Sequence, residues 1–386
     1  MSDAEQTYDV IVIGAGIAGA SVAAFLAPHR SVLLLEMEVQ PGYHTTGRSA
    51  ALFTRIYGPK PIRALTRSSA AFFEQPPDGF AERPLLSPRG ALMVAREDQI
   101  GSLETAYDEL SAETDIPRFD GAQTQALFPL LRPGYAAASI SDPGALDIDV
   151  NGLHHGFLRQ FKRAGGRLLC DSPVRSIEQV AYGVAGGDVP NWLVETDAQL
   201  YRATVVINAA GAWADEIGAL AGASRIGLVP KRRSVMTVAQ PPQYDLAEAP
   251  VIVDIDEQFF LKPDGGQMLI SPANEDPSAP CDAQPDEMDI AVCAERIERA
   301  FQFSVTRFSN KWAGLRSFVF DKSPVCGFDP RLDTFFWLAG QGGYGIQTAP
   351  ALADLAASMV LGRPVPPYIL DQEFDLETVL PDRLVG

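Results

Sequence analysis

The chain of 386 residues contains little cysteine and little histidine, with four of each. The cysteines are scattered and none forms a CxxC pair, which excludes the usual zinc spacings and a disulfide framework and indicates reduced thiols. The histidines do not fall at metal-ligand spacing either, because the adjacent pair His154 and His155 would point in different directions on a helix. We therefore expect no metal site.

Long apolar runs are also missing, although 46% of the residues are hydrophobic. No run approaches the roughly 20 apolar residues that a membrane-spanning helix needs. The first ten residues are acidic and polar, with no basic region leading into an apolar one, so we expect no signal peptide. Reduced cysteines and this N-terminus together predict a cytoplasmic location.

Positive charge is scarce relative to negative charge. The chain has 31 lysines and arginines against 49 acidic residues, which gives a net charge of −18. Such a field disfavours nucleic acid and anionic membranes as partners. We interpret most of this negative charge as an exposed charged surface that keeps the protein soluble. A preference for cationic substrates is an alternative that net charge alone leaves open.

Three separated segments have the pattern of a strand, a small-residue turn and a helix. In the first, residues 8–13 predict a buried strand, 17–27 a helix and 31–36 a second buried strand. Residues 202–222 and 334–362 repeat the order. These segments indicate one discontinuous α/β domain.

The sequence between these segments has a different pattern. Residues 226–272 carry several strand-like runs with a hairpin turn at 263–266, residues 286–303 are helix-like, and residues 111–135 are assigned to the same part. The predicted fold is α/β (α+β overall), a Rossmann-like first domain with an inserted second domain of antiparallel sheet and helices. The predicted ranges are 1–80, 145–225 and 325–386 for the first domain, and 81–144 and 226–324 for the second.

The first glycine motif lies between a predicted strand and a predicted helix. Gly14 permits a tight turn, Gly16 lets the backbone approach a pyrophosphate, and Gly19 allows close packing of helix and strand. The helix N-terminus supplies free N–H groups to the phosphates. Glu36 ends the next strand, where an acid binds ribose hydroxyls. This motif predicts a dinucleotide but does not choose between NAD and FAD.

Longer stretches of the sequence indicate FAD rather than NAD. The segments that carry a resemblance are VIVIGAGIAGASVAAFLA, VLLLE, PGYHTTGRSAAL, RALT, LLSPR, PKRRS, DEQFFLKPDGG, SPANEDP, WAGLRSF and QGGYGIQT. They run nearly from end to end, and the chain resembles the D-amino-acid oxidase/dehydrogenase superfamily of flavoproteins, the bacterial D-arginine dehydrogenases most of all. The resemblance implies noncovalently bound FAD.

The resemblance also implies which residues hold the cofactor. Without it, close helix–strand packing is an alternative interpretation of the segment NAAGAW (208–213). The predicted contacts are Gly14, Gly16, Ile17, Ala18, Gly19, Glu36, Met37, Thr45, Thr46, Gly47, Arg48, Ser49, Ala50, Ala51, Leu52, Val174, Ala210, Gly211, Trp213, Gly342, Gly343, Tyr344, Gly345, Ile346 and Gln347.

The last glycine turn is expected at the isoalloxazine ring, again by resemblance. Its glycines would let the backbone reach the carbonyl edge of the ring. The helix beginning near Ile346 would direct its positive end at N1 and O2, where charge gathers on the reduced flavin.

The substrate residues follow from the same resemblance. Arg233 and Arg316 match the arginines that bind the substrate carboxylate, a role that suits the planar guanidinium fork. Tyr57, Phe260 and Gly343 complete the predicted catalytic site. Taken singly, an arginine is more often a surface cation or an ion-pair partner, and a tyrosine a half-buried core residue. Arg232 is expected to be the solvent-facing neighbour of Arg233.

Three departures from the D-arginine dehydrogenases make the expected pocket less polar. No acid follows LLSPR within residues 89–93, Leu52 replaces a histidine, and Phe260 replaces a tyrosine. A buried cationic side chain without its acid would be costly. Neutral or hydrophobic D-amino acids are therefore predicted in preference to D-arginine and D-lysine.

The reaction that the resemblance implies is oxidative deamination of D-amino acids to 2-oxo acids and ammonia, with hydride passing from Cα to flavin N5. No catalytic base stands out. Residues 267–270 lack the lysine that promotes reaction with oxygen in sarcosine-oxidase-like relatives, which favours a dehydrogenase that passes electrons to a quinone or another acceptor. Cys326 does not lie where those relatives attach flavin covalently.

Other interpretations share the same motifs. The chain could oxidise a secondary amine, an N-substituted amino acid or a 2-hydroxy acid, or it could be a flavin subunit of a larger oxidase complex. A flavin-dependent aromatic hydroxylase is disfavoured because the GD stretch typical of that group near the flavin is absent.

Overall fold

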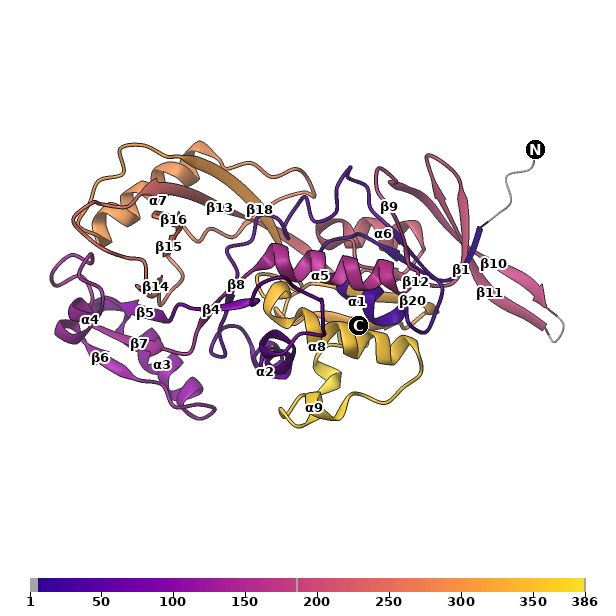
Figure 1. Ribbon diagram of the computed structural model, residues 1–386, viewed down its shortest axis with the longest axis horizontal. Coiled ribbons are helices and arrows are strands. Elements are labelled where there is room, and N and C mark those ends of the chain that lie inside the picture. Colours follow the sequence, from indigo (N-terminus) through magenta and orange to yellow (C-terminus); the bar gives the residue numbers. More distant parts are fainter. Residues whose placement is uncertain (1–5, 185–186, 385–386) are drawn as a thin grey trace.

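The computed structural model describes residues 6–184 and 187–384. The predicted ranges 1–80, 145–225 and 325–386 also include residues 1–5, 185–186 and 385–386, which lie outside the described residues. Two large sheets lie at opposite ends of the molecule in Figure 1, with several helices between them. Within the described ranges, no helix is long and apolar enough to cross a membrane.

The first sheet has a parallel centre. Strand β1 lies between β12 and β2 and runs parallel to both, with Val12 opposite Ile207 on one side and Leu34 on the other. The strands of this sheet are β1 (Gln6–Ile13), β2 (Val32–Leu35), β9 (Arg167–Leu169), β10 (Val174–Val184), β11 (Gly187–Thr196), β12 (Leu200–Asn208), β19 (Val325–Asp329) and β20 (Leu332–Ala339).

Both faces of β1 are buried, which explains its continuous apolar run. Val10 and Val12 pack into a core shared with α1, α2, α5 and α8, whereas Ile11 and Ile13 pack into a second core with α6. The helices of the chain are α1 (Ile17–Leu26), α2 (Lys60–Glu74), α3 (Ile100–Ser111), α4 (Gly121–Leu127), α5 (Val150–Arg163), α6 (Ala214–Leu220), α7 (Glu287–Ala300), α8 (Gly345–Val360) and α9 (Pro367–Leu370).

The second sheet is mostly antiparallel. Its strands are β5 (Ala91–Ala95), β6 (Arg118–Asp120), β7 (Ala138–Asp142), β13 (Val229–Ala239), β14 (Val251–Asp254), β15 (Phe260–Asp264), β16 (Gln267–Ser271), β17 (Asp276–Pro277) and β18 (Asn310–Phe318). Because side chains alternate along a strand, the sheet has two distinct faces. Ile252 and Leu261 pack with α7 into one core, and Val253 and Phe260 line a cavity on the other face.

A small third sheet connects the two parts. Its strands are β3 (Leu52–Phe53), β4 (Leu86–Pro88) and β8 (Leu146–Ile148), with β8 in the centre. The predicted α/β fold with an antiparallel insertion is confirmed, as are the hairpin at 263–266 and the helix within 286–303. The exact domain boundaries stay a prediction.

Candidate active site

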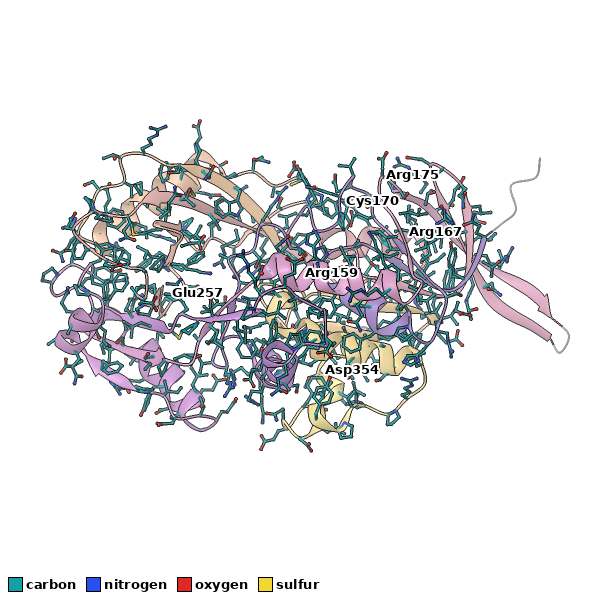
Figure 2. All side chains as sticks on the ribbon, in the orientation of Figure 1. Arg159, Arg167, Cys170, Arg175, Glu257 and Asp354 are labelled. Carbon is teal, nitrogen blue, oxygen red and sulfur yellow. The ribbon has the colours of Figure 1, made fainter. Side chains whose placement is uncertain are left out.

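One elongated cavity of about 650 Å³ lies between the parallel sheet and the second sheet. Figure 2 labels two residues of its lining, Glu257 and Arg175, which lie far apart in the molecule. The lining comes from segments across the whole chain, including both glycine turns. A cavity of this size and shape suits a long cofactor together with a small substrate.

The first glycine turn forms one wall. Gly14 has a φ of +99°, and a Cβ atom there would lie 2.5 Å from the carbonyl oxygen of Ala209. Gly16 is the N-cap of α1 and lines the cavity with Ile17 and Ala18, so the N-terminal end of this helix faces the space. Gly19 instead packs the helix onto the strand, since a Cβ would lie 1.8 Å from the Gly14 oxygen.

Glu36 lies at the carboxyl end of β2, as the motif predicts. Its carboxylate accepts hydrogen bonds from the Ala15 amide (2.8 Å) and the Glu38 amide (3.0 Å). Burial raises the pKa of Glu36, although these two amides and the nearby His44 act in the opposite direction. His44 also lines the cavity, and its ring lies 4.7 Å from the ring of Trp213. Glu36 therefore orders the glycine turn from beside the cavity.

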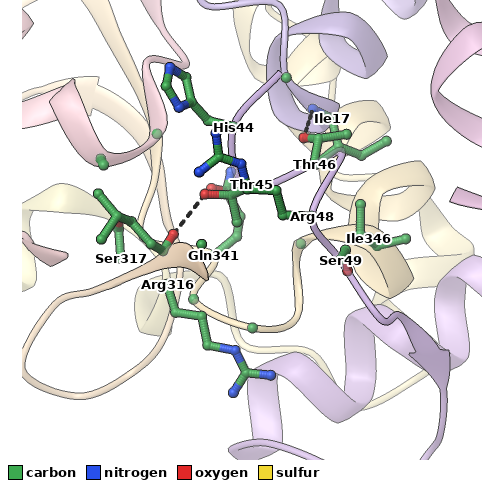
Figure 3. A pocket seen from close by; sticks show the side chains of 18 of the residues that line it. Ile17, His44, Thr45, Thr46, Arg48, Ser49, Arg316, Ser317, Gln341 and Ile346 are labelled. Carbon is green, nitrogen blue, oxygen red and sulfur yellow. Dashed lines mark hydrogen bonds between the residues drawn. The ribbon is translucent and has the colours of Figure 1, made fainter. Parts of the chain in front are cut away.

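The loop of residues 43–52 forms a second wall. Figure 3 shows Thr46 accepting a hydrogen bond from the Ile17 amide (2.9 Å) and Thr45 donating one to the Leu315 carbonyl (2.8 Å). The loop thereby touches both the start of α1 and strand β18. Gly47 does not line the cavity, because its amide binds Gly42 within the loop.

Arg48 ties this loop to the second sheet. Its Nη1 donates to the carbonyls of Ala283 (3.0 Å) and Ala313 (2.9 Å), and its Nη2 forms an ion pair with Asp282. The Trp312 indole in turn donates to the Arg48 carbonyl (3.1 Å). Although Arg48 lines the cavity, its guanidinium contacts hold the loop in place, a role that the sequence analysis did not assign.

The second glycine turn lies at the same cavity. Gly342 has a φ of +54°, and α8 begins at Gly345, one residue before the predicted start. Gln347 accepts a hydrogen bond from the Thr54 amide (3.3 Å), but its buried Nε2 has no partner among the described residues. An unpartnered amide that lines the cavity indicates a ligand with an acceptor atom at this place. Two amide-rich turns at one cavity fit the two ends of FAD.

The predicted substrate residues meet beside the second glycine turn. Arg316 donates to the Tyr57 hydroxyl (3.2 Å). A Cβ on Gly343 would lie 2.5 Å from Cζ of Arg316, so only glycine leaves room for this guanidinium. Tyr344 does not line the cavity; it is buried, and its ring packs 5.0 Å from that of Tyr57. Tyr344 therefore supports Tyr57 from behind.

Arg233 is 6% exposed and faces the same cavity. Its Nη2 lies 3.3 Å from Glu275 and 3.6 Å from Glu257, and its Nε is buried without a partner among the described atoms. Burial, with the charge of Arg316 adding to it, lowers the pKa of Arg233 to about 10. An unsatisfied guanidinium N–H beside a second arginine can bind a carboxylate.

The neighbouring Arg232 corrects one expectation. It points to the opposite face, as predicted, but it is not simply solvated. Its Nε binds Asp289 of α7 at 2.9 Å. This ion pair fixes the helix to the back of the sheet, because Asp289 also accepts from the Ser234 hydroxyl (2.6 Å).

The structure brings most of the predicted residues together. Every predicted catalytic and cofactor residue lines the cavity except Gly19, Gly47 and Tyr344. Besides Arg175 and Glu216, the sequence analysis missed two charged residues of the lining, Glu257 and Lys262. Both belong to the stretch DEQFFLKPDGG, which is one of the segments that carry the family resemblance. The sequence shows that these two residues are charged. Whether their side chains point into the cavity depends on the turn and the strand on which they lie.

Comparisons with known proteins agree with this geometry. A family model described as FAD dependent oxidoreductase matches residues 9–359. The FAD-dependent oxidoreductase domain-containing protein 1 of Bos taurus is 26% identical over 407 residues, covering 92% of this chain and 82% of that protein. The mitochondrial dimethylglycine dehydrogenase of Mus musculus is 25% identical over 273 residues, covering 68% of this chain and 30% of that protein.

Solved structures show the same fold. Glycine oxidase from Geobacillus kaustophilus superposes with a TM-score of 0.77 at 19% identity, covering 93% of this chain and 96% of that chain. At this identity the similarity concerns the fold. The closer resemblance to D-arginine dehydrogenases stays a prediction.

Proposed function

Because this chain belongs to the FAD-dependent oxidoreductase (DAO) family, with FAD as its cofactor, we propose that it oxidises the C–N bond of a D-amino acid. The products would be a 2-oxo acid and ammonia. The side chain of the substrate would be neutral or hydrophobic rather than basic, and the electrons would pass to a quinone or another acceptor.

The observation that carries the proposal is the pair of arginines beside the second glycine turn. Arg316 is held by Tyr57, and Arg233 keeps a buried N–H without a partner. Two guanidinium groups at one cavity can bind the α-carboxylate of an amino acid with several charge-assisted hydrogen bonds. In a chain with a net charge of −18, this local positive charge supports an anionic group as the ligand.

The residues of this chain would bind and orient the substrate. Bound FAD supplies a hydride acceptor, and its chemistry accounts for the difficult step. Arg233 and Arg316 would fix the carboxylate, which leaves the amine and Cα free to face the cofactor. The wall formed by Val253 and Phe260 would exclude water around the side chain.

The test is the visible spectrum of the purified protein under anaerobic conditions, before and after addition of pooled D-amino acids. We expect the flavin band to bleach with the D pool and not with a pool of the L enantiomers. Detection of 2-oxo acid and ammonia in stoichiometry with bleached flavin would identify oxidative deamination. A band that bleaches only with the L pool, or with neither, would contradict the proposal.

A second candidate is oxidation of an N-substituted amino acid. The similarity to dimethylglycine dehydrogenase over 68% of this chain favours it, and the same arginines would bind the carboxylate of such a substrate. A pool of N-methylated amino acids added to the same anaerobic sample separates the two. Bleaching by this pool, with formation of formaldehyde or a 2-oxo acid and no bleaching by primary D-amino acids, would favour the second candidate.

A further inference from the structure

The cavity wall carries a nearly buried lysine that the proposed function does not use. Lys262 lies on β15, two residues after Phe260, and its side chain is 9% exposed. Residues two apart on a strand point to the same face, and both of these line the cavity. The ammonium group of Lys262 therefore belongs to the cavity rather than to the core beside α7.

Strand register places Lys262 beyond the apolar part of the wall. Phe260 pairs with Val253 and Leu261 with Ile252, and continuing this register sets Lys262 opposite Val251 on the same face as Phe260. Val251 pairs in turn with Ala91 of β5. On the other side Lys262 pairs with Leu269 of β16, so the side chains beside it along the sheet are apolar and offer its ammonium group no acceptor.

The charge around Lys262 is not balanced. Its Nζ lies 2.7 Å from Oδ1 of Asp147, but Oδ2 of the same carboxylate accepts a hydrogen bond from Nε of Arg89 (2.7 Å). One carboxylate between two cations leaves a net positive charge. Within the part of the chain that the structure describes, Asp147 is the only acidic residue that forms an ion pair with Lys262, although an ammonium group has three donors.

Glu257, an acid of the cavity lining, lies elsewhere. Glu257 is 3.6 Å from Arg233, at the arginine end of the cavity, and it precedes Phe260 on the turn before β15. Within the described residues Glu257 forms an ion pair with Arg233 and none with Lys262. A cationic side chain next to Lys262 would meet like charge, and a purely apolar one would leave the ammonium donors without acceptors.

We propose that Lys262 binds a carboxylate at the end of the substrate side chain, so that the preferred substrates are acidic D-amino acids. This inference rests on the proposed function, since it takes the α-carboxylate to be at Arg233 and Arg316. The side chain would pass along Phe260 and Val253 and end at Lys262. It replaces the neutral or hydrophobic side chain of the proposed function with an acidic one and keeps the rest of that function.

The experiment compares D-glutamate and D-aspartate with D-glutamine and D-leucine in the holoenzyme. The rate of anaerobic flavin reduction is measured against substrate concentration for the wild type, Lys262→Met, Lys262→Arg and the control Lys60→Met. Lys60 lies at the exposed start of α2, away from the cavity. In Lys262→Met the Asp147 carboxylate keeps Arg89, so we expect the protein to fold and to retain FAD.

We expect the wild type to prefer D-glutamate or D-aspartate to D-leucine. A hydrogen bond to a charged group is worth about 1.5–3 kcal/mol, so Lys262→Met should lower the ratio of kcat/KM for the acid to that for D-leucine by about ten-fold or more. Lys262→Arg should keep most of the preference, and Lys60→Met should keep all of it.

Two results would overturn the inference while leaving the proposed function intact. One is a wild type that reduces its flavin with D-leucine faster than with either acid. The other is a Lys262→Met variant that loses activity on all side chains equally, which would indicate a structural ion pair. If no D-amino acid bleaches the flavin, the proposed function fails, and the inference is decided by ligand binding instead. Glutarate should then perturb the flavin spectrum at lower concentration than butyrate, and equal affinity would overturn it.

Discussion

Arg316 and Arg233 face one cavity but have different partners. Arg316 donates to the neutral Tyr57 hydroxyl, whereas Arg233 lies between the carboxylates of Glu257 and Glu275. Its two acids partly neutralise Arg233 before a substrate arrives. No protein carboxylate forms an ion pair with Arg316 among the described residues, so a substrate carboxylate has less competition at Arg316 than at Arg233. We therefore expect Arg316 to contribute more to binding of a carboxylate.

Replacing Arg316 by methionine should lower kcat/KM for the best substrate by about 10- to 150-fold, because a hydrogen bond to a charged group is worth about 1.5–3 kcal/mol. The flavin content should not change, since Arg316 is not needed for either glycine turn to form. Steady-state kinetics with the FAD absorbance as reference measures both quantities. Arg307→Met, at an exposed position between α7 and β18, is the matched control. Equal losses in the two variants would contradict the assignment.

The pKa of Arg233 predicts how binding depends on pH. Its pKa lies at about 10, below the ordinary value for arginine, because burial and Arg316 disfavour the charged form. Below pH 10 the guanidinium holds its proton and attracts a carboxylate, and above pH 10 it loses the proton. The affinity for a carboxylate should therefore be constant up to about pH 9 and fall beyond pH 10.

The measurement is a spectral titration with a 2-oxo acid, which has no amine of its own to titrate. Arg233→Met removes the titrating group, so its affinity should be weaker than that of the wild type but flatter across the same pH range. A fall of equal size in both proteins would assign the effect to another group, such as the flavin.

At the scale of elements, the two glycine turns differ in what a side chain would meet. At Gly14 a Cβ would strike the backbone of Ala209 at 2.5 Å, and the φ of +99° is itself unfavourable for other residues. At Gly343 a Cβ would strike the end of the Arg316 side chain, which can move. The backbone of the fold therefore requires glycine in the first turn, whereas in the second turn it is a side chain of the candidate active site that requires it.

This difference predicts two outcomes for the same substitution. Gly343→Ala should keep FAD and raise KM by about ten-fold, because the Arg316 guanidinium must shift from its place. Gly14→Ala should lose FAD and stability together. Flavin content and KM are measured side by side with Gly101→Ala, whose site on α3 has open space. If Gly343→Ala loses FAD while its KM stays unchanged, the turn serves the cofactor and not Arg316.

The contacts of Arg48 predict a variant that weakens FAD binding without touching the glycine turns. Arg48→Ala removes the bonds to Ala283 and Ala313 and the ion pair with Asp282, which hold the 43–52 loop to the second sheet. We expect the dissociation constant of FAD, followed by flavin fluorescence, to rise by about ten-fold. Asp282→Asn keeps the two carbonyl contacts and should have a smaller effect. Unchanged FAD affinity in Arg48→Ala would show that the loop is held by its other bonds.

Local elements could be predicted from the sequence because their signals are local. The strand, turn and helix around Gly14 follow from apolar runs and glycine spacing within a few residues. The roles of Arg48 and Tyr344 could not be predicted this way. Arg48 bonds to residues 235 and 265 positions away, and no local pattern specifies such partners. The family resemblance predicted that both residues contact the cofactor. The structure shows in addition which protein groups each of them contacts.

At the scale of the whole molecule, the cavity is built from segments that are distant in the sequence. Residues 14–18, the 43–52 loop and residues 340–347 meet there with strands of the second sheet. A cofactor bound at this junction stabilises only the folded arrangement of all these segments. Removal of FAD should therefore loosen the whole molecule rather than one part of it.

Apoprotein prepared by removal of FAD should accordingly unfold at a lower temperature than the holoprotein. A ligand present at 100 times its dissociation constant adds about 2.7 kcal/mol to the free energy of unfolding. We expect a rise in Tm of several degrees when FAD is added back, increasing with FAD concentration. Riboflavin, which lacks the pyrophosphate and adenosine, should give a smaller rise. Identical Tm values with and without FAD would contradict a site that spans the junction.

Net charge predicted less about the site than individual residues did. The total of −18 left open a preference for cationic substrates, yet the cavity contains Arg233, Arg316 and Lys262. Their acidic partners are Glu257 and Glu275 at Arg233 and Asp147 at Lys262. A sum over the chain is dominated by the exterior, whereas the field in a cavity depends on which side chains point inward. That direction requires the strand register, which the sequence alone did not specify.

The measurement that tests the central claim most directly is the rate of anaerobic flavin reduction by D-amino acids and by the corresponding D-amino acid amides. The two pools share amine, Cα–H and side chain, and they differ only in the carboxylate that Arg233 and Arg316 would bind. Our account predicts reduction by the D-amino acids and a rate at least about 100-fold lower with the amides. Equal rates with both pools, or reduction by neither, would contradict it.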